Sequence, residues 1–215
     1  MTPPRIKICG VTLPDDAARV AAAGVDFIGL NFWPRSKRFV APERAPLLAA
    51  AARASGAAKL VGVFVDATLE QIIATCARVE LDIIQLHGDE RADACSRVSG
   101  ALYRPVWKAL PIADRRDLDG LDHWQVDALL LDAPSTGRGG SGARFDHQLA
   151  REARERYPAR TFVLAGGLDP ANVAAAIALV EPWAVDVASG VEVAPGVKDP
   201  AKLAAFVAAV RGSAK

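Results

Sequence analysis

The chain has 215 residues, of which 51% are hydrophobic and 24% charged, and its formal net charge is +1. This composition is typical of one large soluble domain, and a near-neutral chain without a basic stripe argues against nucleic acid as a partner. The N-terminal stretch MTPPRIKICG contains no apolar signal segment and no run of 18 apolar residues occurs. We therefore expect neither secretion nor a membrane span.

The few metal-binding and thiol residues are scattered. The three cysteines are Cys9, Cys76 and Cys95, and the three histidines are His87, His123 and His147. An odd number of cysteines outside metal-ligand spacing suits a reducing compartment, so we expect a cytoplasmic protein. Neither a metal nor an organic cofactor is expected.

Eight short runs rich in β-branched residues are predicted to be strands, and alanine-rich segments with helical spacing separate them. The predicted strands are Arg5–Cys9, Phe27–Phe32, Lys59–Val65, Ile83–Leu86, Arg104–Ala109, Ala128–Leu131, Thr161–Leu164 and Ala184–Val187. The predicted helices lie within residues 13–24, 41–56, 68–79, 146–156, 169–180 and 199–212, with weaker ones near 90–99 and 113–121.

Local signals mark several helix ends. Thr68 is a candidate N-cap, Gly24 is a good residue to follow a helix, and Pro170 and Pro200 stand where a first helical residue is expected. Strict alternation of strand and helix favours a parallel sheet. The length suits a small closed (β/α)₈ barrel, a TIM barrel, forming a single catalytic domain over residues 1–215. An open, doubly wound sheet of eight strands is the structural alternative.

In such a barrel, residues at the carboxyl ends of strands face the active site. Polar residues at or near these ends are Cys9, Asn31, His87, Lys108, Asp132 and Asp186. Each has a structural alternative, because a cysteine can be a small buried residue and a strand-end aspartate can cap the next helix. Six together favour a functional site, although solvated loop starts could explain two or three of them.

Alternation along the strands refines this prediction. If Cys9 points into the mouth of the barrel, Lys7 points inward below it, and the same parity turns Asp132 and Asp186 inward. Strand eight borders strand one in a closed barrel, so Lys7 and Asp186 are predicted to be neighbours. A buried ammonium group needs such a partner.

Two late glycine turns predict a phosphate site. Gly166–Gly167 follows the seventh strand and Ser189–Gly190 follows the eighth. Glycines let the backbone approach an anion closely, and barrels frequently bind phosphate with these two loops and a short extra helix. Residues 190–195 are a candidate for that helix. The alternative is a pair of ordinary tight turns.

Two other segments need separate interpretation. GRGGSG at 137–142 fits a dinucleotide fingerprint, but no clear helix follows it and no acidic residue stands about twenty positions on. A lid over the substrate explains these glycines better. The basic run PRSKRF at 34–39 is either a solvated loop or a clamp for a carboxylate.

Several motifs together resemble the phosphoribosylanthranilate isomerase family of tryptophan biosynthesis, nearly end to end and in the family's order. They are KICG at 7–10, PRSKR at 34–38, GVFVD at 62–66, QLHGDE at 85–90, LLLD at 129–132, GGSGARFD at 139–146, LAGGLDPANV at 164–173 and VDVASGVE at 185–192. The resemblance implies a (β/α)₈ barrel, in agreement with the strand count.

The resemblance also implies an Amadori rearrangement of N-(5-phosphoribosyl)anthranilate by general acid/base catalysis. It implies Asp132 as the acid that protonates the ribose ring oxygen, Cys9 as the base that removes the C2 proton, and Arg38 as the partner of the anthranilate carboxylate. The residues implied for phosphate are Gly166, Gly167, Ser189 and Gly190. His87 and Asp186 match further polar positions of the site.

The sequence departs from the family pattern at His147, where tryptophan is common, and at Ala188, where serine is common. Two rivals remain: another phosphosugar barrel enzyme, which would pair two carboxylates or a carboxylate with a lysine, and a phosphate-binding module without catalysis. The expected partner is a small phosphosugar substrate, and the chain is expected to be a monomer or a homodimer.

Overall fold

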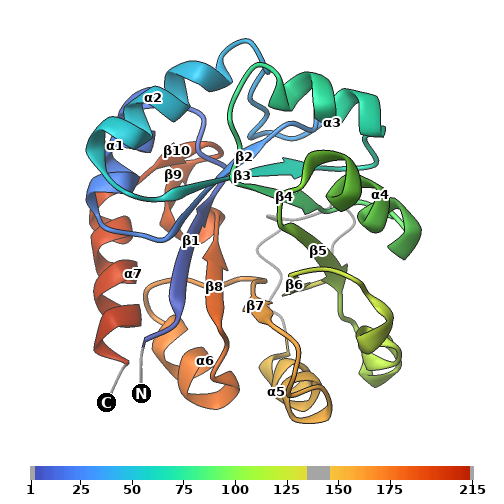
Figure 1. Cartoon of the computed structure of the whole chain (residues 1–215). Coiled ribbons are helices and arrows are strands. Elements are labelled where there is room, and N and C mark those ends of the chain that lie inside the picture. The colour runs from blue at the N-terminus through green and yellow to red at the C-terminus, as the bar shows by residue number, and fades with distance from the viewer. Residues whose placement is uncertain (1–2, 135–145, 214–215) are drawn as a thin grey trace.

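The protein is described by a computed structural model, which describes residues 3–134 and 146–213. The GRGGSG motif at 137–142, expected to form a lid, lies in the segment 135–145 and so outside the described residues. Eight parallel strands close into a barrel in the order β1 to β8, so the open-sheet alternative is excluded. The helices surround the barrel (Figure 1).

The strands of the barrel lie within two residues of the predicted ones. They are β1 (Arg5–Cys9), β2 (Phe27–Asn31), β3 (Lys59–Phe64), β4 (Ile83–Leu86), β5 (Val106–Pro111), β6 (Ala128–Asp132), β7 (Phe162–Leu164) and β8 (Ala184–Val187). The helices are α1 (Pro14–Ala22), α2 (Ala45–Ser55), α3 (Leu69–Cys76), α4 (Ala92–Leu102), α5 (His147–Arg156), α6 (Val173–Val180) and α7 (Pro200–Gly212).

Several predicted helix ends are confirmed. Thr68 caps α3 in a reciprocal capping box with Gln71, Pro200 opens α7, and Gly24 follows α1 with φ +71°. The prediction for Pro170 is wrong, because residues 170–172 form a turn and α6 begins only at Val173.

The prediction of a helix near residues 113–121 is wrong. Two short 3₁₀ turns replace it, η1 (Arg115–Leu118) and η2 (Leu121–His123). Asp114 accepts from the amide of Arg116 and caps the first turn, and Gly120 between the turns has φ +77°. A left-handed residue at this point ends any right-handed helix.

Two apolar layers follow from the alternation of the strands. Inward-facing residues fill the barrel, and they include Val61, Trp107, Leu130 and Val163. Outward-facing residues such as Leu129, Leu131, Val185 and Val187 pack under the helices. The predicted parity of β6 and β8 is therefore confirmed.

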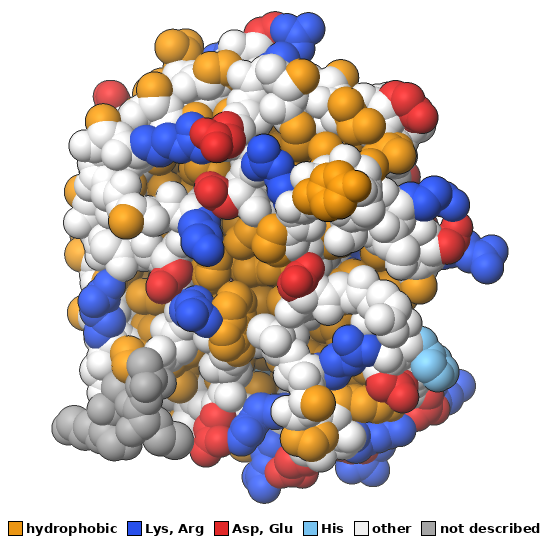
Figure 2. Space-filling model, viewed as in Figure 1, with side chains coloured by type: hydrophobic (Ala, Val, Ile, Leu, Met, Phe, Trp, Pro, Cys, Tyr) orange, Lys and Arg blue, Asp and Glu red, His pale blue; other side chains and the backbone are white. Residues whose placement is uncertain are grey.

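The surface carries charges of both signs. On the face shown in Figure 2, acidic and basic side chains are interspersed, with hydrophobic side chains visible between them. Within residues 3–134 and 146–213, no helix combines the length and the apolar character needed to cross a membrane.

Candidate active site

Cys9 and Asp132 end strands β1 and β6 on the same rim of the barrel. Cys9 shares the inward parity of Lys7, and Asp132 shares that of the interior residue Leu130. Both residues are partly exposed. Because β8 and β7 separate β1 from β6 in the closed barrel, the thiol and the carboxyl group reach the mouth from different sides.

Cys9 lies against a glycine and a buried ammonium group. A β-carbon on Gly29 would stand 2.8 Å from Sγ of Cys9 and 3.2 Å from Nζ of Lys7, so the absence of a side chain on β2 makes room for both. Burial raises the pKa of the Cys9 thiol, and the Lys7 ammonium partly offsets this by favouring the thiolate.

The predicted pair of Lys7 and Asp186 is confirmed. Nζ of Lys7 donates to Oδ1 of Asp186 at 3.0 Å, and the two residues stand opposite each other in the register of β1 and β8. Burial alone would lower the pKa of Lys7, but the carboxylate of Asp186 and the nearby Cys9 raise it. Lys7 therefore stays protonated beneath Cys9.

Asp132 and His87, two of the polar strand-end residues, face each other. Nε2 of His87 lies 3.5 Å from Oδ2 of Asp132, and Oδ1 accepts from the amide of Ala133 at 2.8 Å. Gln85 lies on β4, two residues before His87. The distance between Nε2 of Gln85 and Nδ1 of His87 is 2.9 Å. The Nε2 group of Gln85 can only donate, so Nδ1 of His87 is the acceptor in this contact.

Gln85 was not among the predicted site residues. Its side chain is wholly buried, and Oε1 has no hydrogen-bond partner among the described residues. The sequence did contain a signal for Gln85. It lies two positions before His87, so the alternation of β4 turns both side chains to the barrel interior.

Lys108, in contrast, does not belong to the site. Strand β5 runs two residues further than predicted, and its interior residues are Trp107 and Ala109. Lys108 therefore points toward the outer layer, where Nζ donates to Glu90 at 2.9 Å and to the carbonyl of Gly88 at 2.6 Å. Its role is to fix the loop that follows His87.

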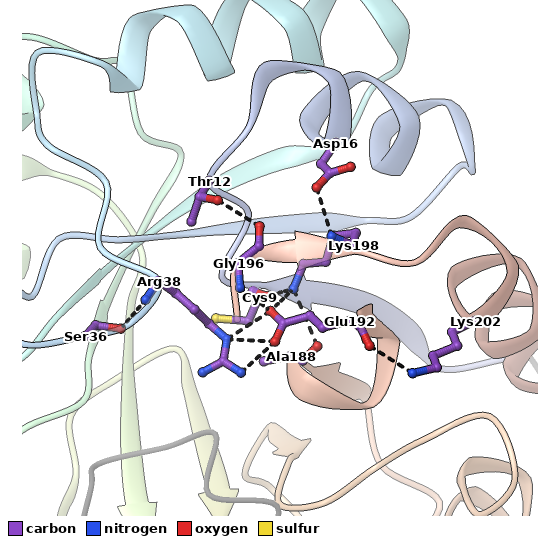
Figure 3. A network of polar contacts seen from close by, with 10 residues as sticks. All are labelled: Cys9, Thr12, Asp16, Ser36, Arg38, Ala188, Glu192, Gly196, Lys198 and Lys202. Carbon is purple, nitrogen blue, oxygen red and sulfur yellow. Dashed lines mark hydrogen bonds and ion pairs between the residues drawn. The ribbon is translucent and has the colours of Figure 1, made fainter. Parts of the chain in front are cut away.

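Arg38 reaches the rim beside Cys9. Its aliphatic stem lies so close to Gly10 that a β-carbon there would overlap it. The guanidinium group donates to Glu192 through Nε at 2.9 Å and through Nη2 at 2.6 Å (Figure 3). Nη1 makes no hydrogen bond to any described residue, so one edge of the fork is available for another anion.

Glu192 and Lys198 complete this arrangement and were also missed from the sequence. They are cross-strand partners in a small antiparallel hairpin formed by β9 (Glu192–Ala194) and β10 (Val197–Lys198). Nζ of Lys198 donates to Glu192 at 2.7 Å and to the carbonyl of Cys9 at 2.6 Å (Figure 3). The signal in the sequence was the place of Glu192 at the end of the motif VDVASGVE, after the glycine loop.

The two glycine loops lie against each other. Gly166 and Gly167 have φ values of +85° and +72°, and their amides donate to no acceptor among the described residues. A β-carbon on Gly190 would overlap the carbonyl oxygen of Leu168, so the loop after β8 needs a glycine at this close approach. Ser189 is exposed beside it. Backbone amides without a protein acceptor in such a glycine turn suit an anion.

The expected extra helix is only partly present. Residues Ser189–Val191 form one 3₁₀ turn, η3, but β9 replaces the rest of the predicted segment. Gly196, with φ +84°, makes the turn to β10 and so favours a hairpin over a helix. No group of three or more His, Cys, Asp or Glu residues suited to a metal ion occurs in the described part of the chain.

A closed β/α barrel with a thiol, a carboxyl group and paired glycine loops on one rim defines the class of barrel proteins that act on phosphorylated small molecules. The family model described as N-(5'-phosphoribosyl)anthranilate (PRA) isomerase matches residues 6–209. The chain belongs to this family.

Individual relatives agree. An N-(5'-phosphoribosyl)anthranilate isomerase of Magnetococcus marinus is 47% identical over 216 residues, with 96% of this chain and 95% of the relative covered. The N-(5'-phosphoribosyl)anthranilate isomerase of Geotalea uraniireducens is 43% identical over 209 residues, with 97% of this chain and 98% of the relative covered.

Solved structures of phosphoribosyl anthranilate isomerases are similar to this chain in fold. The phosphoribosyl anthranilate isomerase of Thermotoga maritima has a TM-score of 0.88 and 38% identity, covering 97% of this chain and 99% of its own. A phosphoribosyl anthranilate isomerase in complex with reduced 1-(o-carboxyphenylamino)-1-deoxyribulose 5-phosphate has a TM-score of 0.84 and 36% identity, with the same coverage.

Proposed function

We propose that this chain isomerises N-(5'-phosphoribosyl)anthranilate to 1-(2-carboxyphenylamino)-1-deoxyribulose 5-phosphate, the reaction of its family in tryptophan biosynthesis. The observation that carries the proposal is the placement of Cys9 and Asp132, which end β1 and β6 with inward parity on one rim. An acid on one side of a bound pentose and a base on the other are what this reaction requires.

In this mechanism the carboxyl group of Asp132 gives its proton to the ribose ring oxygen. The bond between C1 and that oxygen breaks, and the nitrogen lone pair forms a Schiff base. The thiolate of Cys9 then removes the proton from C2, which gives an enolamine. Tautomerisation of the enolamine yields the ketone. Lys7 supports the second step because its ammonium group favours the thiolate over the thiol.

Binding is assigned to the neighbouring rim groups. The free edge of Arg38 suits the planar carboxylate of the anthranilate ring. The amides of Gly166 and Gly167, with Ser189 and Gly190, suit the phosphate at the far end of the substrate. His87 contacts Asp132 and is assigned to the orientation of the acid.

The test is turnover by two variants, Cys9→Ala and Asp132→Asn, followed through the loss of substrate fluorescence. General acid/base catalysis contributes about 10²–10⁴-fold, so each variant is expected to lose at least that factor in kcat. Both should still bind the reduced product analogue with affinity close to that of the unaltered protein. Full activity in either variant would contradict the role given to that residue.

An unaltered chain that does not consume the substrate would contradict the activity itself, and another phosphosugar would then be the ligand to screen. For assembly we propose a monomer or a homodimer, since one solved relative is described as a dimeric enzyme from which monomers were generated. A cytoplasmic location is proposed because Cys9, Cys76 and Cys95 are all free.

A further inference from the structure

Beside Cys9 three charged side chains form one buried network, the Glu192 network, made of Arg38, Glu192 and Lys198 (Figure 3). The exposed fractions of their side chains are 12%, 4% and 0%, respectively. Two cations, Arg38 and Lys198, share the single carboxylate of Glu192. The positive charge that Glu192 leaves over favours a further anion at the rim, either the thiolate of Cys9 or the carboxylate of a ligand.

Glu192 holds Arg38 in one orientation. Its two oxygens accept from Nε and Nη2 of Arg38, and Oε1 also accepts from the amide of Gly196 at 3.2 Å. This bidentate contact fixes the plane of the guanidinium group. The edge that includes Nη1 is then turned away from Glu192, where a planar carboxylate can meet it.

Lys198 connects this clamp to the strand that carries the thiol. Its ammonium group bonds to Glu192, to the carbonyl of Cys9 and, at 3.5 Å, to the carbonyl of Ala188. The same cation lowers the pKa of Cys9, while burial raises it. Burial also lowers the pKa of Lys198 itself, and the carboxylate of Glu192 counters that shift.

The hairpin that carries both residues is anchored on its other side. The amide of Lys198 donates to the buried carboxylate of Asp16 at 2.9 Å, and Thr12 donates to the carbonyl of Gly196 at 2.7 Å. Lys202 of α7 also bonds to the hairpin, but only to the backbone carbonyl of Glu192. Lys202 is exposed, so it provides a matched control for loss of one nearby positive charge.

We propose that Glu192 and Lys198 are positioning residues: Glu192 fixes Arg38 for the carboxylate of the substrate, and Lys198 links this clamp to Cys9. The inference rests on the proposed function, because it assigns the free edge of Arg38 to the anthranilate carboxylate. Neither residue needs to touch the substrate.

The first experiment compares two ligands, reduced 1-(o-carboxyphenylamino)-1-deoxyribulose 5-phosphate and the same compound without its carboxyl group. The unaltered protein should prefer the carboxylated ligand. Glu192→Gln is expected to reduce this preference roughly 30-fold, the loss typical for breaking a buried charge pair, and to leave affinity for the second ligand within about threefold. Lys202→Met should keep the full preference.

A preference unchanged in Glu192→Gln would overturn the inference, and so would an equal loss for both ligands, which a merely structural role predicts. If this variant does not fold, Glu192→Gln combined with Lys198→Gln removes one charge of each sign and allows the same comparison. Failure of the unaltered protein to bind either ligand would count against the proposed function, a separate result.

The second experiment measures the pH dependence of Cys9 alkylation by iodoacetamide, with mass spectrometry to separate Cys9 from Cys76 and Cys95. Lys198→Met is expected to move half-maximal alkylation of Cys9 to higher pH, because the thiolate loses a nearby cation. Lys202→Met should leave it unchanged. Identical profiles for the two variants would remove Lys198 from the proposal.

Discussion

At the scale of single residues, the ionisation of Cys9 decides when the base is available. Burial and the carboxylate of Asp186 raise the pKa of the thiol, whereas Lys7 and Lys198 lower it, and the net direction is upward. The thiol is the inactive form of the base. The active thiolate therefore accumulates as pH rises.

We expect the rate at which iodoacetamide alkylates Cys9 to increase with pH through neutrality, by about tenfold for each pH unit below the thiol pKa, because the thiolate is the reactive form. Turnover does not isolate this step, since the proposed mechanism also needs the proton of Asp132. Alkylation rates between pH 5 and pH 9, with mass spectrometry to resolve the three cysteines, measure this limb. Cys76 is a suitable control, since burial also raises its pKa while it lies in α3 away from the rim. Cys76→Ala should reproduce the profile. An alkylation rate independent of pH would contradict a thiol whose pKa is raised.

Gln85 shows how a buried polar group can serve the site at the expense of stability. Its Oε1 lacks a partner among the described residues while its Nε2 faces His87. Gln85→Leu removes that unpaired oxygen, so stability toward urea should be unchanged or about 1 kcal/mol higher. Loss of the contact with His87 should lower kcat roughly tenfold.

A double-mutant cycle checks the route of this effect. If Gln85 acts through His87, Gln85→Leu should cause little further loss of kcat in a His87→Ala background. Additive losses would mean that Gln85 affects the acid by another path.

At the scale of elements, the glycine loops after β7 and β8 depend on each other. Gly190→Ala would force its methyl group against the carbonyl of Leu168 and move one loop from the other. We expect KM to rise at least about tenfold as phosphate contacts are lost, because a charge-assisted contact is worth roughly 1.5–3 kcal/mol. Inhibition by inorganic phosphate should weaken in parallel.

Gly100 near the end of α4 gives the matched control, because a β-carbon there meets no atom within 4 Å. Gly100→Ala should leave KM unchanged and stabilise the helix by about 0.5–1 kcal/mol. Equal KM values for Gly190→Ala and Gly100→Ala would show that the loops do not form the phosphate site.

The sequence predicts the elements best where burial dictates the residue type. The β-branched runs locate all eight strands, because an interior strand must be apolar on both faces. The prediction for β5 is displaced by two residues, which made Lys108 look like a strand end, whereas the interior residues of this strand are Trp107 and Ala109. The turns at 113–121 and the β9–β10 hairpin depend on backbone dihedrals at Gly120 and Gly196 that composition does not reveal.

The candidate site is predictable to the same extent. Strand ends and parity identify Cys9 and Asp132, because position in a barrel sets direction. Glu192 meets Arg38 only through a tertiary contact that spans 154 residues of chain, and Lys198 joins them through Glu192. No local pattern carries that information.

At the scale of the whole molecule, closure of the barrel brings together strands from opposite ends of the chain. Lys7 on β1 stands opposite Asp186 on β8 at this seam, and both are buried. An ammonium group without a partner would be too costly inside the barrel, so the pair favours the one register in which the two charges meet. The seam thus links the fold to the chemistry, because the same lysine lies beneath Cys9.

We expect Lys7→Met to lower the free energy of unfolding by about 3–5 kcal/mol, since it leaves the carboxylate of Asp186 buried without its partner. Combining it with Asp186→Leu should recover most of that stability, because an apolar pair can replace a buried ion pair at little cost. Urea unfolding measures both. The double variant should nevertheless stay far less active, since no cation beneath Cys9 favours its thiolate. Full activity in that variant would mean that the seam charges serve only closure of the barrel.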